Sequence, residues 1–254
     1  MPIHGKRQME RFKINNMRTQ NLQRLADTKI TRANKYYLHY YPFHRDLVEA
    51  IRKYAKGKVL DIGCGNKPYE KEFDANVSAY IGCDIIQSDL NKVDILCAAN
   101  DIPLENLSVD TVFSTQTIEH VEDHQGLVNE AFRVLKPGGF FIVSGPMYWH
   151  LHEQPYDFFR FTEYGFKYVL EKAGFEITEI KANGGMWATT GQNIIHSFMN
   201  SKSKQFFIRA SRFLFFRLQF YRLTSTFFSW LDKLDYNPIN TMNYVVVGNK
   251  PLIQ

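Results

Sequence analysis

The sequence predicts an α/β protein whose core is a doubly wound, mostly parallel sheet with helices on both faces. Residues 58–62 form an apolar segment that runs into a turn containing Gly63 and Gly65. A second apolar segment, residues 79–85, carries Asp84 at its end, about 20 residues after the glycines. Further apolar segments then alternate with segments of helical periodicity, which is the element order of a parallel sheet.

The composition favours one large globular domain. The chain has 254 residues, of which 44% are hydrophobic, and a net charge of +5 that is too small to favour a nucleic-acid partner. The three cysteines, Cys64, Cys83 and Cys97, have no CxxC spacing and are expected as buried free thiols in a reducing compartment. No secretory leader and no spanning apolar run is predicted, so we expect a cytoplasmic protein, with peripheral contact at the inner face of the membrane as an option.

The remaining elements are predicted from periodicity and from start and stop signals. Thr162 is expected to cap one helix, and Gly174 is expected to end it. Helices are expected at residues 44–54, 69–73, 124–135 and 163–173, and strands at residues 93–96, 108–114, 140–144, 175–180 and 242–248.

The glycine turn also indicates a class of ligand. A dinucleotide fingerprint would need glycine where the chain has Pro68, and a P-loop would need a Gly-Lys-Ser/Thr sequence that is absent. Asp61 directly precedes the turn, and a carboxylate there would repel phosphate but suit a cationic or amine-bearing ligand such as S-adenosylmethionine. Asp84 stands where a carboxylate can accept hydrogen bonds from ribose hydroxyls.

Three segments carry a resemblance to a known family. Asp61-x-Gly63-x-Gly65 resembles motif I of the class I methyltransferases, which usually have a further glycine where this chain has Lys67. Residues 108–114 and 133–139 resemble the fourth strand of that superfamily and its connection to the fifth. The resemblance covers residues 44–180 and, more weakly, 241–250. It implies a Rossmann-like sheet of seven strands with an antiparallel last strand, and S-adenosylmethionine as cofactor.

The resemblance also places the cofactor on particular residues. The methionine end is assigned to the glycine turn, and Gln116 and Thr117 should face the cofactor at the end of the fourth strand. Near adenine, Asn100 or Asp101 is expected to replace an acid that relatives carry where this chain has Ala98. The predicted cofactor-binding residues are Asp61, Gly63, Gly65, Asp84, Ile85, Asn100, Asp101, Ile102 and Gln116.

The loop after the fifth strand is expected to determine the substrate. It resembles the His-Glu-x-Pro-x-Asp-x-x-Arg-Phe-Thr segment of a bacterial branch of these methyltransferases, often found among surface-glycan assembly enzymes. His152 or Glu153 is the candidate base, and Arg160 is a candidate ligand for an acceptor phosphate or carboxylate. Alternatively, Asp157 and Arg160 form an ion pair that pins the loop. The predicted catalytic residues are His152, Glu153, Asp157, Arg160 and His120.

No metal is predicted, because His150, His152 and Glu153 match no established zinc spacing.

Residues 1–35 are predicted as a basic arm and residues 36–254 as the methyltransferase domain, including a helical insertion at residues 186–235 that is rich in aromatic residues and arginine. This insertion is expected to pack on the core, to form a homodimer, or to contact a membrane peripherally. The predicted function is methyl transfer from S-adenosylmethionine to an oxygen or nitrogen of a small-molecule, glycan or lipid-linked acceptor. The alternative is a catalytically silent scaffold acting at a membrane or in a complex.

Overall fold

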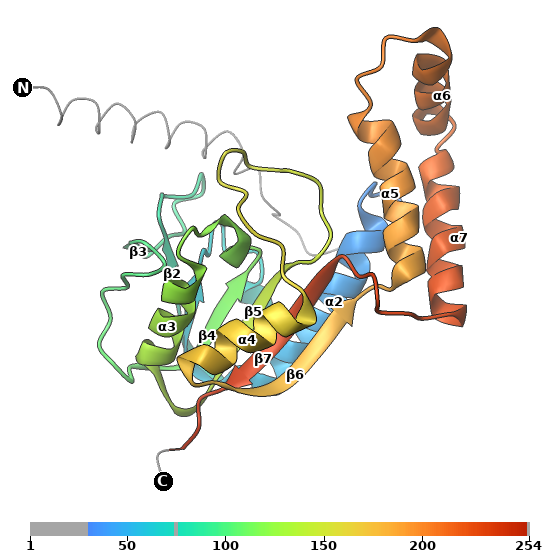
Figure 1. Ribbon diagram of the computed structural model, residues 1–254. Coiled ribbons are helices and arrows are strands. Elements are labelled where there is room, and N and C mark those ends of the chain that lie inside the picture. Colours follow the sequence, from blue (N-terminus) through green and yellow to red (C-terminus); the bar gives the residue numbers. More distant parts are fainter. Residues whose placement is uncertain (1–29, 74–75, 253–254) are drawn as a thin grey trace, which may run out of the picture.

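The computed structural model describes residues 30–73 and 76–252 and shows one seven-stranded sheet (Figure 1). The predicted arm therefore lies largely outside the described residues. The sheet has the order β3-β2-β1-β4-β5-β7-β6. Its strands are β1 Gly57–Ile62, β2 Val77–Asp84, β3 Ile95–Leu96, β4 Val109–Thr115, β5 Leu135–Pro146, β6 Glu176–Asn183 and β7 Asn243–Asn249.

The strand directions confirm the predicted fold class. The first five strands in chain order pair in parallel, and β7 runs antiparallel to both of its neighbours, β5 and β6. The helices are α2 Tyr37–Tyr54, α3 His124–Val134, α4 Glu163–Ala173, α5 Met186–Asn200, α6 Phe206–Arg217 and α7 Phe220–Leu234, with short 3-10 turns η1 Glu70–Glu72 and η2 Ile118–His120.

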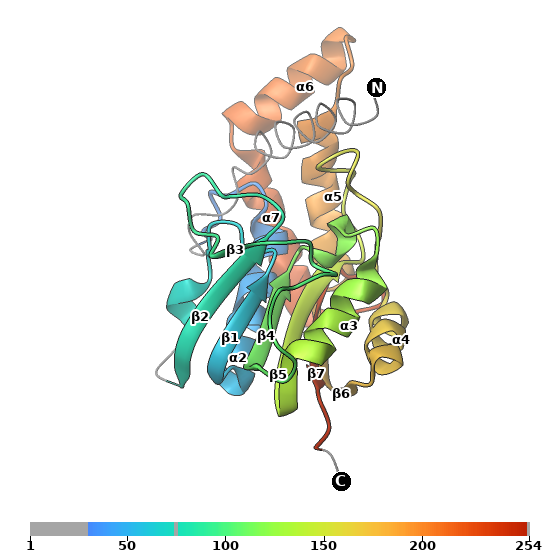
Figure 2. The same ribbon diagram turned by 90° about the vertical axis from the view of Figure 1, so that its left-hand side faces the viewer.

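The sheet is buried on both faces because neighbouring strand residues point to opposite sides. Val59 of β1 and Phe113 of β4 pack with α2 in one cluster. Leu60 and Val112 pack on the opposite face with α3 and α4. Figure 2 shows α3 and α4 in front of the strands and α2 behind them. This layering leaves the carboxyl ends of the parallel strands open for a site.

Several boundaries differ from the prediction. The first helix begins at Tyr37 rather than at residue 44, because the aromatic residues before Pro42 are themselves helical. The glycine turn leads into the single 3-10 turn η1 instead of a helix at residues 69–73. Strand β5 begins at Leu135, whereas a turn at residues 136–139 was expected to separate the helix from the strand. Thr162 caps α4 and Gly174 ends it in a left-handed conformation, as predicted.

Helices α5, α6 and α7 form a helical hairpin before the last strand. Ile195, Phe215 and Tyr221 pack together with Leu38 of α2, so all three helices of the hairpin contact the domain through this cluster. In both views α6 lies at the end of the hairpin farthest from the sheet (Figures 1 and 2). Among the described residues, no helix combines the length and apolar character needed to cross a bilayer.

Candidate active site

Two cavities lie at the carboxyl ends of the parallel strands. The first, about 380 Å³, is formed by the ends of β1, β2 and β3 and by the loops that follow them; we call it the nucleoside cavity. The second, about 810 Å³, lies between the glycine turn, the start of α2 and the loop after β5; we call it the aromatic cavity. Gly63, His120 and Glu153 line both cavities, so the two meet at these residues.

Asp61 lies at the end of β1, beside the glycine turn, and lines the aromatic cavity. Its side chain is buried, and the Tyr80 hydroxyl donates a 2.5 Å hydrogen bond to Oδ2. Burial raises the pKa of Asp61 to about 7; the Tyr80 hydrogen bond opposes this shift and the neighbouring Asp84 adds to it. A buried carboxyl with this pKa suits a cationic group, which would stabilise its ionised form.

The two glycines of the turn have different structural roles. Both have positive φ, +77° at Gly63 and +47° at Gly65. A Cβ on Gly63 would overlap the Thr117 side chain, so the protein itself requires glycine there. A Cβ on Gly65 would meet no protein atom within 4 Å and would enter the aromatic cavity. The space beside Gly65 is therefore available to a ligand.

Asp84 joins this turn to the end of β2. Its carboxylate accepts hydrogen bonds from the backbone amides of Gly65 at 3.1 Å and Ile85 at 2.7 Å. A carboxylate has about four acceptor positions, so hydroxyls in the nucleoside cavity can still be bound. Lys67 adopts a left-handed φ of 55°, and its Nζ lies 2.6 Å from Asp94.

The nucleoside cavity contains only part of the predicted adenine site. Ile85 and Asn100 line it together with Ala98 and Phe158. Asn100 donates a 3.0 Å hydrogen bond to Asp123. Asp101 and Ile102, in contrast, line neither cavity: Asp101 is exposed, and Ile102 is a buried residue of the core. The chain turns between Ala98 and Asp101 and directs these two side chains away from the site.

Gln116 lies in the aromatic cavity with a left-handed φ of 49°. Its side-chain amide donates a 3.2 Å hydrogen bond to Ser144 Oγ at the end of β5. Thr117, the next residue, lines the nucleoside cavity. The strand-four residues predicted to face the cofactor therefore contribute to different cavities.

Arg160 holds the loop after β5 in place and has no contact with either cavity. It makes a bidentate ion pair with Asp157, at 2.6 and 2.8 Å. Its remaining donors bind the backbone carbonyls of Trp149, His150 and Phe159. Because these contacts occupy the guanidinium, the structure favours the alternative of a loop-pinning ion pair over an acceptor-binding role for Arg160.

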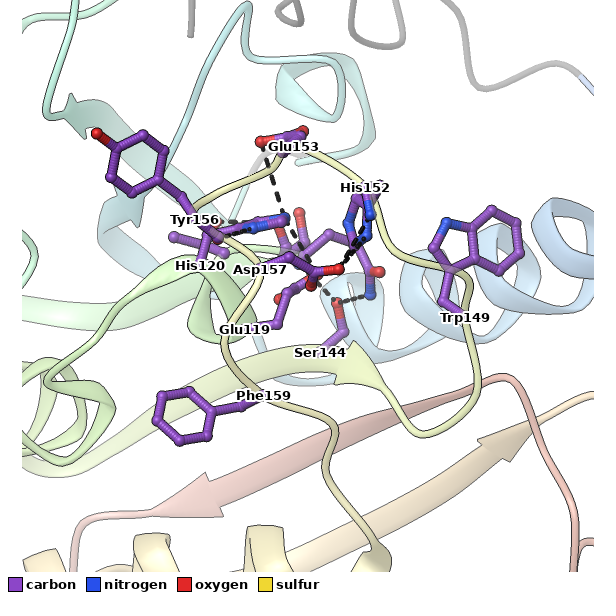
Figure 3. Close-up of polar contacts among 12 residues, drawn as sticks. Glu119, His120, Ser144, Trp149, His152, Glu153, Tyr156, Asp157 and Phe159 are labelled. Atoms are coloured by element: carbon purple, nitrogen blue, oxygen red, sulfur yellow. Dashed lines mark hydrogen bonds and ion pairs between the residues drawn. The ribbon is translucent and has the colours of Figure 1, made fainter. Parts of the chain in front are cut away.

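Asp157 also positions His152. Oδ2 of Asp157 accepts the His152 backbone amide at 3.0 Å and lies 3.3 Å from His152 Nδ1 (Figure 3). Burial alone would raise the pKa of Asp157, but hydrogen bonds from Arg160 and the His152 amide lower it to about 2. Burial, helped by His120, lowers the pKa of His152, so its ring is neutral at pH 7 and can accept a proton.

His120 and two carboxylates complete this group. His120 Nδ1 lies 2.7 Å from the Tyr156 carbonyl, so in the neutral ring this nitrogen carries the proton and donates it. His120 Nε2 then lies 3.8 Å from both Glu153 Oε2 and Glu119 Oε1 (Figure 3). Glu119, which is fully buried, and the partly buried His120 and His152 bring ligand atoms within 4.8 Å of one another and have the chemistry to hold a divalent metal ion.

The opposite wall of the aromatic cavity is made of rings. Tyr36, Tyr40 and Trp149 line it, and the His39 ring lies 4.1 Å from Trp149 between ring centres. The aromatic cluster at the start of α2 therefore serves both cavity and core, since Phe43 is fully buried. The sequence did not indicate the Tyr80 contact or the role of Trp149. Both depend on contacts between separate elements, which a motif does not reveal.

Part of the sheet domain is similar in sequence to known methyltransferases. The model of a family described as a methyltransferase domain matches residues 60–143. A probable S-adenosylmethionine-dependent methyltransferase of Mycolicibacterium smegmatis is 39% identical over 97 residues, covering 35% of this chain and 37% of that protein. The 27-O-demethylrifamycin SV methyltransferase of Amycolatopsis mediterranei is 28% identical over 113 residues, covering 36% and 42%. The chain thus spans about two fifths of the length of these relatives.

Solved structures match over most of the chain, but at low sequence identity. The cyclase SpnF superposes with a TM-score of 0.56 and 15% identity, covering 89% of this chain and 86% of its own. A proposed methyltransferase of Bacillus halodurans gives 0.52 and 16%, covering 82% and 99%. Likeness at this level establishes the fold alone. Residues 60–143 thus match a methyltransferase-domain family, and the chain as a whole has the seven-stranded Rossmann-like fold of class I methyltransferases.

Proposed function

We propose that this protein transfers the methyl group of S-adenosylmethionine to a hydroxyl oxygen of an uncharged acceptor in the aromatic cavity, with His152 as general base. The observation that carries the proposal is the position of His152. Its neutral ring lines the cavity, and the Asp157 carboxylate, fixed by Arg160, lies beside Nδ1. Asp157 opposes the lowering of the His152 pKa by burial and His120, and so favours the imidazolium that forms when a proton is accepted.

The polar groups that line the two cavities match those of S-adenosylmethionine. Asp61 offers a carboxylate to an ammonium group, Gly65 leaves space beside it, and Asp84 offers acceptors to ribose hydroxyls. Bound there, S-adenosylmethionine would supply an electrophilic methyl group. The protein would contribute mainly orientation, holding the attacking oxygen in line at about 3–3.5 Å from its target.

The lining of the aromatic cavity restricts the acceptor. It contains the acids Asp61 and Glu153 and, within the described chain, neither lysine nor arginine. An acceptor phosphate or carboxylate would meet like charge there, whereas a sugar or phenol could stack on Trp149 and the tyrosines. An amine acceptor is the second candidate, because the Glu153 carboxylate would also attract a cation.

The test is a transfer assay that detects S-adenosylhomocysteine with sugar, phenol and amine acceptors. His152→Ala should lower kcat about 100-fold or more, while the affinity for S-adenosylhomocysteine stays unchanged. His124→Ala is the matched control, because this residue lines neither cavity. Activity that is lost on chelation would indicate a metal at Glu119, His120 and His152 instead of simple base catalysis. A folded protein that binds no S-adenosylhomocysteine would contradict the proposal and favour a scaffold.

A further inference from the structure

The end of the helical hairpin carries large exposed apolar side chains. We call these side chains, on α6, on its link to α7 and on the first residue of α7, the tip surface. Their exposed fractions run from 43% at Phe220 to 83% at Phe207. Helix α6, which carries most of them, lies at the far end of the hairpin from the sheet in both views (Figures 1 and 2). The tip surface consists of Phe206, Phe207, Phe213, Leu214, Leu218 and Phe220.

The same part of the chain is strongly basic. No acid occurs between Glu179 and Asp232. In the described structure, the basic residues around the tip surface take part in no ion pair. Asp232 is at the base of the hairpin, where it accepts the amides of Gly185 and Ala188. The basic residues are Lys202, Lys204, Arg209, Arg212, Arg217 and Arg222.

A groove along α6 combines these two properties. It encloses about 760 Å³, and Arg209, Arg212 and Arg217 line it beside Phe206 and Phe213. A guanidinium group binds phosphate oxygens in a bidentate manner, and its stem can lie along apolar surface. Aromatic rings beside such groups suit the boundary between phospholipid headgroups and acyl chains.

We propose that the tip surface docks on an anionic phospholipid bilayer, with α6 lying in the interface and its arginines on lipid phosphates. A second copy of the chain is a poorer occupant, because two tip surfaces would bring arginines together without an acid to pair with them. Residues 1–29 are a poorer occupant for the same reason, since they carry seven lysines and arginines against two acids. An anionic lipid surface matches both the charge and the apolar rings.

The test measures vesicle binding by the full chain, without cofactor or acceptor, so its outcome is independent of the proposed reaction. The protein should float with vesicles of phosphatidylcholine mixed with phosphatidylglycerol, far less with phosphatidylcholine alone, and less in high salt. Phe206→Ser with Phe207→Ser should weaken binding at least about tenfold. Arg209→Gln with Arg217→Gln should weaken it about 30-fold.

Matched controls distinguish binding through the tip surface from nonspecific hydrophobic or electrostatic binding by other parts of the protein. Trp230→Ser with Leu234→Ser removes comparably exposed apolar side chains from the other end of α7, and should leave binding unchanged. Lys167→Gln with Lys172→Gln removes the same charge from α4 and should also have no effect.

Either control pair weakening binding as much as the tip variants would overturn the proposal. The absence of vesicle binding by folded wild-type protein would also overturn it. Should light scattering then show a dimer that the phenylalanine pair abolishes, the surface is a homodimer contact.

Discussion

Asp61 should make cofactor affinity fall as the pH drops below neutral. Burial raises the pKa of Asp61 to about 7, with Asp84 adding to the shift, while the Tyr80 hydroxyl and Lys67 oppose it. Below this pKa the unliganded carboxyl holds a proton, which must leave before the carboxylate can pair with the ammonium group of the ligand. The dissociation constant of S-adenosylhomocysteine should therefore rise tenfold per pH unit, and be about 30-fold larger near pH 5.5 than near pH 8.

Isothermal titration calorimetry across this pH range measures the effect directly. In buffers of different ionisation enthalpy, it should also detect about one proton released per ligand bound below pH 7. Asp61→Asn is the control: its affinity should be weak and flat over the range. A flat wild-type profile, or an equal slope in Asp61→Asn, would refute the assignment of Asp61 to the ammonium group.

The same raised pKa affects the stability of the unliganded protein. The folded state binds a proton at Asp61 more tightly than the unfolded state, whose carboxyl has a pKa near 3.8. This contribution is therefore complete below the unfolded value and is lost as the pH rises through about 7. Urea unfolding should show the wild type losing stability over this window relative to Asp61→Asn, whose amide oxygen can still accept the Tyr80 hydroxyl. Parallel pH profiles for the two proteins would contradict this expectation.

Two further perturbations separate structural from ligand-binding roles. Gly65→Ala should weaken S-adenosylhomocysteine binding and cost about 1 kcal/mol of stability because of its positive φ. Gly63→Ala should instead unfold at a much lower urea concentration, because its Cβ overlaps Thr117. Equal losses of stability in the two alanine variants would show that this distinction is wrong. Arg160→Lys cannot reproduce the bidentate contact with Asp157, so it should cost about 2–3 kcal/mol of stability and lower kcat while cofactor affinity is kept. Wild-type kcat in that variant would exclude a positioning role.

Much of the fold could be predicted because buried parallel strands and their turns leave strong local signals. Asp61, Gly63 and Gly65 follow an apolar run, and Asp84 follows the next, so their proximity results directly from parallel pairing of β1 and β2. The start of α2 was missed because Pro42 was expected to precede the helix, whereas it lies within it. Proline weakens a helical signal even where the surrounding packing stabilises the helix.

The predictions for the site were least accurate where a loop path decides the contacts. Asp157 and Arg160 have the spacing of a site pair and equally that of an ion pair. Only the closure of the loop onto the Trp149 and His150 carbonyls shows that Arg160 is fully engaged. Tyr80 could not be identified either, because its hydroxyl reaches Asp61 from the neighbouring strand. Local spacing contains no information about such contacts between strands.

Helix α5 of the hairpin packs against the wall of the aromatic cavity, which gives lipid docking a specific place in the proposed reaction. His196 of α5 lies with its ring 4.7 Å from Trp149 and 4.6 Å from His150, directly behind the cavity wall. Gln192 of the same helix donates a hydrogen bond to the Lys35 carbonyl, close to the start of α2. No hairpin residue lines either cavity, but Trp149 and His150, which His196 contacts, both line the aromatic cavity. Docking of the tip surface would therefore act through α5 on the wall of the aromatic cavity, which suits an acceptor presented at a lipid surface.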